Sequence, residues 1–223
     1  MKITCTGHSG FLIEFPGVNL IFDYYTDREN IVTPEVFRGK PTYVFVSHRH
    51  RDHYNKKIFN WSEWGDVTYI LDSGCKIPPG IKENVRKIRE GDEITVANGE
   101  ITVKAYGSTD EGVSFLVKAP GGAGAAVTVF HAGDLNDWYW ADESTPAELA
   151  ADEENYLRVV RQLAGTGIDI AFIPEDPRLG LHAGRGIRFF REIAAPKRII
   201  PMHFPGNEGV STEMEGEAWS VVR

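Results

Sequence analysis

Residues 47–53 read Ser-His-Arg-His-Arg-Asp-His and concentrate side chains that can bind metal ions. Three of the seven histidines and one aspartate fall within six consecutive positions: His48, His50, Asp52 and His53. In an extended segment, side chains two residues apart point the same way, so His48 and His50 can bind one ion. Asp52 and His53 are adjacent and diverge, so they can reach a second ion. A solvated polar turn is the alternative, but this density of imidazole and carboxylate groups favours a metal site.

Apolar strands lead into this cluster and into two later groups of potential ligands. Residues 42–46 are β-branched, aromatic and apolar, which predicts a buried strand that ends at the histidine cluster. Residues 127–130 run in the same way into His131 and Asp134, and residues 199–202 run into His203. Taken alone, His203 would be read as a core or capping histidine. Three clusters at strand ends together predict a shared metal site.

Length and composition indicate an ordinary globular protein. At 223 residues the chain is long enough for one large domain or at most two small ones. The net charge of −8 argues against nucleic acid as a partner, although bound metal ions could offset it in a nuclease. Cys5 and Cys75 are far apart and form no metal or redox motif, which is typical of thiols in a reducing cytoplasm. Without a signal-peptide core or a membrane-spanning stretch, a cytoplasmic protein with no membrane contact is expected.

The remaining pattern predicts many strands and two helices. Residues 153–164 have apolar positions spaced for an amphipathic helix, residues 186–194 are a second helix, and residues 58–64 are helical or irregular. An Asn98-Gly99 pair indicates a hairpin. Two sheets packed face to face with helices outside are therefore expected. The predicted strands are residues 2–6, 10–15, 18–22, 43–46, 67–71, 85–88, 93–97, 101–105, 113–118, 125–130, 169–174 and 198–202.

With these residues in place, the chain resembles the metallo-β-lactamase superfamily. The resemblance rests on an HxHxDH signature at residues 48–53, the later Gly-Asp pair that ends at Asp134, and the strand-end His203. The opening GHSGFLIEF, followed by Phe22-Asp23, is similar to the lactonase-like branch. The resemblance implies an α/β (α+β) fold, a four-layer αββα sandwich, formed by residues 1–223 as a single domain. The metals would lie at one edge between the sheets.

The resemblance also implies a role for each matching residue. The first metal would be bound by His48 and His50, the second by Asp52, His53 and His203, and Asp134 would bridge both. Asp23 would support the cluster loop through hydrogen bonds. His131 would point away from Asp134 in a strand, which favours packing behind the ligands over ligation. His8 and His182 have no partner pattern, although His182 could approach the pocket.

One position departs from the superfamily pattern. The superfamily supplies a further histidine to the first metal shortly before a glycine-rich strand start, and residues 106–111 contain none. Ser108 stands at the equivalent place, and Asp110 is the possible substitute ligand. The first metal could be completed by water, it could be held by Asp110, or the site could hold the second metal alone.

These features predict a metal-dependent hydrolase that uses metal-activated water on an ester, lactone or phosphoester bond of a small molecule. Asp52 would be a ligand and catalytic proton shuttle. Zn is the expected divalent metal, as one or two ions, with Mn, Fe or Ni as alternatives. Trp138 could wall the pocket and Arg178 could bind an anionic substrate, as in the ascorbate-6-phosphate lactonase relatives; both could equally be ordinary surface residues. The alternatives are a nuclease of the tRNA 3′-processing type and a non-catalytic metal-binding member, and an oligomer is possible.

Overall fold

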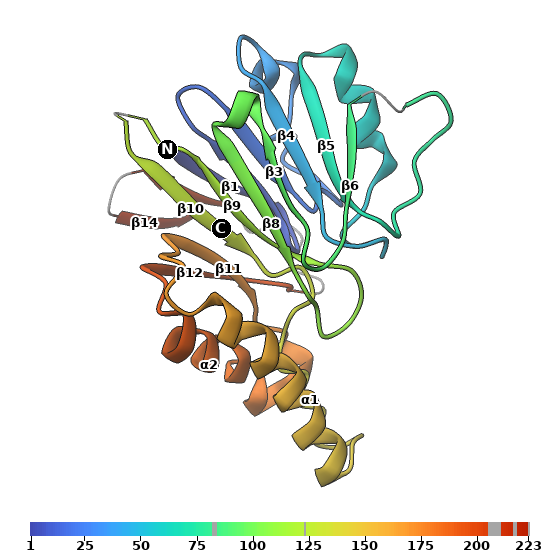
Figure 1. Cartoon of the computed structure of the whole chain (residues 1–223), viewed down its shortest axis with the longest axis vertical. Helices are drawn as coiled ribbons and strands as arrows, with labels where there is room; N and C mark the ends of the chain where they lie inside the picture. Colours follow the sequence, from blue (N-terminus) through green and yellow to red (C-terminus); the bar gives the residue numbers. More distant parts are fainter. Residues whose placement is uncertain (82–83, 123, 205–210, 216–217, 223) are drawn as a thin grey trace. The chain divides into compact units, whose positions relative to one another are not determined.

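Figure 1 shows the computed structural model of the chain, which describes residues 1–81, 84–122, 124–204, 211–215 and 218–222. Its contacts divide the chain into two compact units. The first unit comprises Met1–Arg89, Pro120–Ala126 and Gly206–Arg223, and the second comprises Glu90–Ala119 and Val127–Pro205.

The first unit contains a mixed six-stranded sheet in the order β1-β2-β3-β4-β5-β6. β1, β2 and β3 pair antiparallel, whereas β3, β4, β5 and β6 pair parallel. The parallel part is buried, as expected for strands covered on both faces: all five residues of β4 are buried. The strands are β1 (Lys2–Gly7), β2 (Gly10–Glu14), β3 (Asn19–Phe22), β4 (Thr42–Val46), β5 (Val67–Asp72) and β6 (Val85–Ile88).

Short 3-10 helices connect the parallel strands and pack aromatic side chains beside them. Residues 58–64, expected to be helical or irregular, fall in η2 (Lys56–Glu63) and at its end, and η1 (Pro34–Phe37) precedes β4. Trp61 is buried and its ring lies 5.6 Å from that of Phe37. The first unit also contains an antiparallel pair, β13 (Ser211–Glu215) and β14 (Ala218–Val222). The prediction that the strand at residues 198–202 would be the last was therefore wrong.

The second unit contains another mixed six-stranded sheet, in the order β12-β11-β10-β9-β8-β7. β7, β8 and β9 pair antiparallel, whereas β10, β11 and β12 pair parallel. The predicted hairpin is present, with η3 (Ala97–Gly99) joining β7 to β8 and Asn98 at a φ of 54°. The strands are β7 (Glu93–Val96), β8 (Ile101–Tyr106), β9 (Ser114–Pro120), β10 (Ala126–His131), β11 (Ile170–Pro174) and β12 (Arg198–Met202).

Two α-helices accompany this second sheet and lie side by side in Figure 1. α2 (Arg185–Ala194) stacks Phe190 on Phe130 of β10 at a ring distance of 5.1 Å. The predicted helix at residues 153–164 is α1 (Pro146–Val160), which begins seven residues earlier than predicted because Thr145 caps it. The Thr145 hydroxyl accepts from the Glu148 N–H while the Glu148 carboxylate accepts from the Thr145 N–H, which forms a capping box. Residues 161–163 belong to a separate 3-10 turn, η4 (Arg161–Leu163).

The architecture confirms the α/β class and indicates where chemistry can occur. In each unit, parallel strands end at the same edge of the sheet, so the residues that follow them lie close together. In the first unit these are the residues after β3 and β4, and in the second those after β10, β11 and β12. Within the described parts of the chain, no helix combines the length and apolar character needed to span a bilayer.

Candidate metal-binding residues

Three histidines of the first unit converge in the loop that follows β4. The rings of His48 and His50 are 4.6 Å apart, and those of His48 and His53 are 4.2 Å apart. His48 and His53 are fully buried, whereas His50 is exposed. Backbone hydrogen bonds from His53 and Tyr54 to the His50 carbonyl form the turn that brings the rings together. The contiguous cluster thus folds into a compact group of imidazoles.

Asp23 holds this loop from the end of β3. Its buried carboxylate accepts hydrogen bonds from the Ser47 N–H (2.7 Å), the Ser47 hydroxyl (2.6 Å) and His53 Nδ1 (2.7 Å). The contact arises because β3 and β4 pair in parallel with Phe22 opposite Phe45, so Asp23 and Ser47 emerge close to each other. These are the hydrogen bonds expected of Asp23. Its φ of 40° is unusual for a residue with a side chain.

The same carboxylate determines the tautomers of two histidines. A carboxylate only accepts, so His53 Nδ1 must carry the proton and Nε2 is the nitrogen that can bind metal. The Ser47 hydroxyl gives its proton to Asp23, and it therefore accepts from His48 Nδ1 at 2.9 Å. His48 is likewise left with Nε2 as its metal-binding nitrogen. One buried carboxylate, that of Asp23, thus fixes the tautomers of both His48 and His53.

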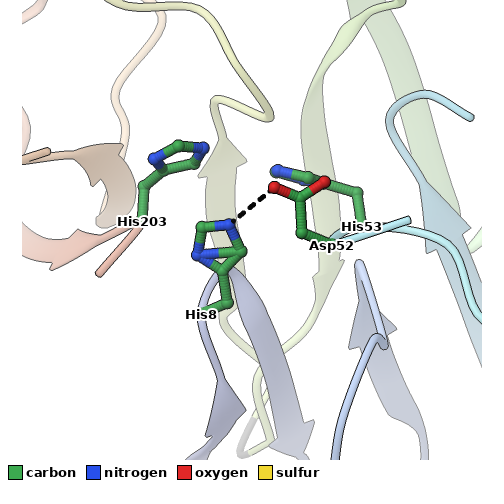
Figure 2. Close-up of side chains that lie close together, drawn as sticks. All are labelled: His8, Asp52, His53 and His203. Carbon is green, nitrogen blue, oxygen red and sulfur yellow. Dashed lines mark hydrogen bonds and ion pairs between the residues drawn. The ribbon is translucent and has the colours of Figure 1, made fainter. Parts of the chain in front are cut away.

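Asp52 has a partner that the sequence analysis did not identify. His8 Nε2 lies 3.1 Å from Asp52 Oδ2, the contact dashed in Figure 2. One potential ligand atom from each of His8, Asp52 and His53 lies within 4.8 Å of the others. The sequence shows no partner pattern for His8 because its partner is 44 residues away in the chain. Figure 2 also draws His203, which belongs to the second unit.

In the second unit, Asp134 and His203 lie together. His203 Nε2 is 3.3 Å from Asp134 Oδ1, and both side chains are buried. His203 Nδ1 donates to Asp176 Oδ2 at 3.0 Å, which again leaves Nε2 for metal. The sequence pattern gives no indication of this role of Asp176. It arises because β11 and β12 run parallel with Pro174 opposite Met202.

Asp176 is an anion held by donors of two residues, His203 and Arg178. Burial alone would raise the pKa of its carboxyl group, but hydrogen bonds from His203 and Arg178 outweigh burial and lower that pKa. The Arg178 guanidinium donates to both carboxylate oxygens. Asp176 therefore stays ionised and can orient His203.

The loop that lacks the expected histidine is tied to the segment that carries Asp134. The Thr109 hydroxyl donates to the Asn136 carbonyl at 2.6 Å and accepts from the Asn136 N–H at 2.9 Å. A carboxylate oxygen of Asp110 lies within 4.8 Å of one of Asp134. The Ser108 hydroxyl accepts from the Asp110 N–H. Asp110 is thus the acidic residue that this loop brings to Asp134.

The other predicted site residues occupy distinct surroundings in the second unit. Trp138 donates from Nε1 to the Asp134 carbonyl at 3.1 Å, and its ring lies 5.4 Å from that of His203. His131 is buried, and its Nδ1 accepts from the Gly133 N–H. Arg178 lies 5.7 Å from the Trp140 ring. Trp138 thus packs beside His203, and the Arg178 guanidinium is engaged with Asp176.

The donors in each unit suit a divalent ion. Two ligands of one tetrahedral ion, each about 2.1 Å from it, are about 3.4 Å apart. The 3.3 Å between His203 Nε2 and Asp134 Oδ1 matches that separation. One imidazole Nδ1 in each unit, that of His53 and that of His203, is already hydrogen-bonded to a carboxylate, as is usual for metal-binding histidines. The residues therefore fit a divalent metal ion.

Comparison with known proteins identifies the family. Residues 2–138, more than half of the chain, match the model of the β-lactamase superfamily domain. The chain belongs to the β-lactamase superfamily. A UPF0173 protein of Pyrococcus abyssi is 35% identical over 111 residues, so the match spans about half the length of that relative (48%) and of this chain. A UPF0173 metal-dependent hydrolase of Desulforamulus reducens is 25% identical over 213 residues, covering 92% of this chain and 84% of the relative.

Solved structures support the β-lactamase superfamily fold. Igni18, a metallo hydrolase from Ignicoccus hospitalis, superposes with a TM-score of 0.58 at 16% identity, covering 94% of this chain and 84% of that one. YhfI of Bacillus subtilis, a metallo-β-lactamase fold protein, gives 0.52 at 15% identity, covering 91% and 85%. At these identities the likeness concerns the fold alone, and it confirms the fold inferred from the sequence.

Proposed function

We propose that this superfamily member is a metal-dependent hydrolase acting on an ester, lactone or phosphoester bond of a small molecule. The observation that carries the proposal is the pair of buried carboxylates, Asp23 and Asp176, that fix the Nδ1 atoms of His53 and His203. Histidines arranged in this way present Nε2 to a metal ion. The name of the Desulforamulus reducens relative, a metal-dependent hydrolase, points in the same direction.

Each unit contributes candidate ligands to the proposed function. In the first unit, His48, His50, Asp52 and His53 would hold metal, and in the second unit Asp134 and His203 would do so. Asp110 takes the place of the absent histidine, a role favoured by its distance to Asp134. Imidazole and carboxylate donors suit Zn best, and Mn, Fe or Ni also.

A bound divalent ion would supply Lewis acidity and a more acidic water. The side chains around it would provide the remaining chemistry. Asp52 is half-exposed, so one of its carboxylate oxygens can receive a proton from the attacking water. Trp138 would bind the apolar part of a substrate, and Arg178, whose side chain is 55% exposed, would attract an anionic group.

A second candidate is a metal-binding protein without catalytic activity. It is favoured by the loop of residues 107–111, which offers Asp110 where the superfamily supplies an imidazole. A nuclease is disfavoured by the net charge of −8. The number of bound ions and the turnover of a model substrate distinguish the hydrolase from the metal-binding protein without catalytic activity.

The test is elemental analysis of purified protein, combined with assays on 4-nitrophenyl acetate and bis(4-nitrophenyl) phosphate. Wild-type protein should carry metal and cleave one of the two, and His48→Ala and Asp134→Ala should lose metal. His182→Ala is the matched control and should keep it, since the His182 ring packs on Tyr139 at 4.5 Å. Metal without turnover would favour the non-catalytic candidate, and unchanged metal in both variants would refute the ligand assignment.

A further inference from the structure

His8 occupies a backbone position that disfavours side chains. It is the first residue of the two-residue loop that joins β1 to β2, where Gly7 pairs with Gly10. Its φ is 54°, and glycine is the residue that such a position in a hairpin normally takes. Residues held in such conformations concentrate at functional sites, which favours a functional role for the side chain of His8.

The imidazole of His8 is directed at a candidate ligand. Its side chain is 5% exposed, and its Nε2 lies 3.1 Å from Oδ2 of Asp52, as the dashed line in Figure 2 shows. Its ring meets the ring of His53 edge-on at 5.3 Å and that of Tyr25 at 6.4 Å. Because an ionised carboxylate only accepts, His8 Nε2 donates to Asp52.

The Asp52 carboxylate needs such a restraint. Its side chain is 47% exposed and belongs to a turn, so rotation about its side-chain bonds would otherwise carry its oxygens away from the metal. A buried imidazole that binds Oδ2 fixes the plane of the carboxylate and leaves Oδ1 available to bind a metal ion. Replacing a donor that orients a metal ligand typically lowers metal affinity about 10–100-fold.

We propose that His8 is a positioning residue that orients Asp52 for metal binding. The proposal rests on the proposed function, in which Asp52 binds a metal ion. It assigns a role to the histidine of the opening Gly-His-Ser turn, which the signature at residues 48–53 does not include. The competing possibility is that His8 itself binds the ion, since 3.1 Å also suits two ligands of one metal.

The experiment is a Co²⁺ titration of metal-free protein, followed by calorimetry and by the visible absorption of the bound ion. Wild type, His8→Ala, His8→Gln, Asp52→Ala and the His8→Ala/Asp52→Ala double variant are compared. His8→Ala should weaken the second binding step about 10–100-fold and leave the first unchanged. His8→Gln, whose amide can donate from nearly the same place, should recover most of the affinity. Thermal unfolding checks that each variant is folded.

The double variant separates positioning from ligation. If His8 acts through Asp52, the double variant should bind Co²⁺ no more weakly than Asp52→Ala alone. Additional weakening, or a changed absorption band in His8→Ala alone, would identify His8 as a ligand and overturn the proposal. Unchanged affinity in His8→Ala would overturn it as well.

A metal-free measurement keeps this test separate from that of the proposed function. Long-range ¹H–¹⁵N NMR of the metal-free protein should show His8 as the Nε2–H tautomer, and Asp52→Ala should alter that signal. Wild-type protein that shows this tautomer but binds no Co²⁺ would refute the proposed function and the positioning role with it. Wild-type protein that binds Co²⁺ while His8 is the Nδ1–H tautomer would refute the positioning role alone.

Discussion

In both units, a buried carboxylate at the end of one parallel strand accepts a hydrogen bond from a histidine that follows the neighbouring strand. The two carboxylates differ in the charge of their other donors. In the first unit, Asp23 follows β3 and accepts from His53, which comes after the neighbouring β4. In the second, Asp176 follows β11 and accepts from His203, which comes directly after β12. In each, a buried carboxylate on one strand end fixes the imidazole of the next.

The difference lies in the other groups that hold each carboxylate. Asp23 also accepts from the Ser47 backbone and hydroxyl, which carry no charge. Asp176 also accepts from the Arg178 backbone N–H and from the Arg178 guanidinium, a permanent cation whose side chain is 55% exposed. The Ser47 donors to Asp23 are therefore buried and neutral, whereas Asp176 is also neutralised by an arginine at the surface. Losing the carboxylate should harm the first unit more than the second.

Asp23→Ala should have the largest effect. It leaves the Ser47 N–H, the Ser47 hydroxyl and His53 Nδ1 without this acceptor in a buried place, and each lost acceptor costs about 1–3 kcal/mol. We expect urea denaturation to show a free energy of unfolding lower by at least about 3 kcal/mol, with loss of bound metal. Asp23→Asn keeps one acceptor oxygen and tolerates a positive φ, so its loss should be smaller. Equal losses for Asn and Ala would contradict this account.

Asp176→Ala should be less costly to stability. The Arg178 guanidinium can turn into solvent and the Arg178 N–H is part-buried, so chiefly His203 Nδ1 loses a buried acceptor. We expect a loss of about 1–2 kcal/mol in the free energy of unfolding. Metal affinity should fall about 10–100-fold, because His203 is no longer oriented. The comparison between the units would fail if Asp176→Ala destabilised the protein as much as Asp23→Ala.

Arg178→Ala should have the smallest effect on stability, below about 1 kcal/mol, because the guanidinium is exposed. If Arg178 also binds an anionic substrate, the variant should raise KM for a carboxylated 4-nitrophenyl ester but not for an uncharged one. Arg178→Lys keeps the charge without the bidentate hydrogen bonding, so its KM for the carboxylated ester should lie between those of wild type and Arg178→Ala. A similar rise in KM for both esters would restrict Arg178 to holding Asp176.

The sequence predicted the parts of the candidate site whose partners are close in the chain. His48, His50 and His53 converge because six consecutive residues form one turn, a local property. His8 and Asp176 were missed because their partners are 44 and 27 residues away and meet them only through strand pairing.

The same limit applies to the fold. The start of α1 was predicted late because its first turns lack apolar periodicity, although the Thr145 and Glu148 spacing of a capping box was present. The buried parallel strands were found because continuous apolar runs identify them without reference to their neighbours.

The central claim is that buried carboxylates leave Nε2 of His53 and Nε2 of His203 for metal. Anomalous diffraction from crystals of the metal-loaded protein tests it most directly, because an ion and its ligands are located together. We predict that Nε2 of each of these histidines binds metal. Metal bound through Nδ1 of either histidine, or metal bound by neither, would contradict the account.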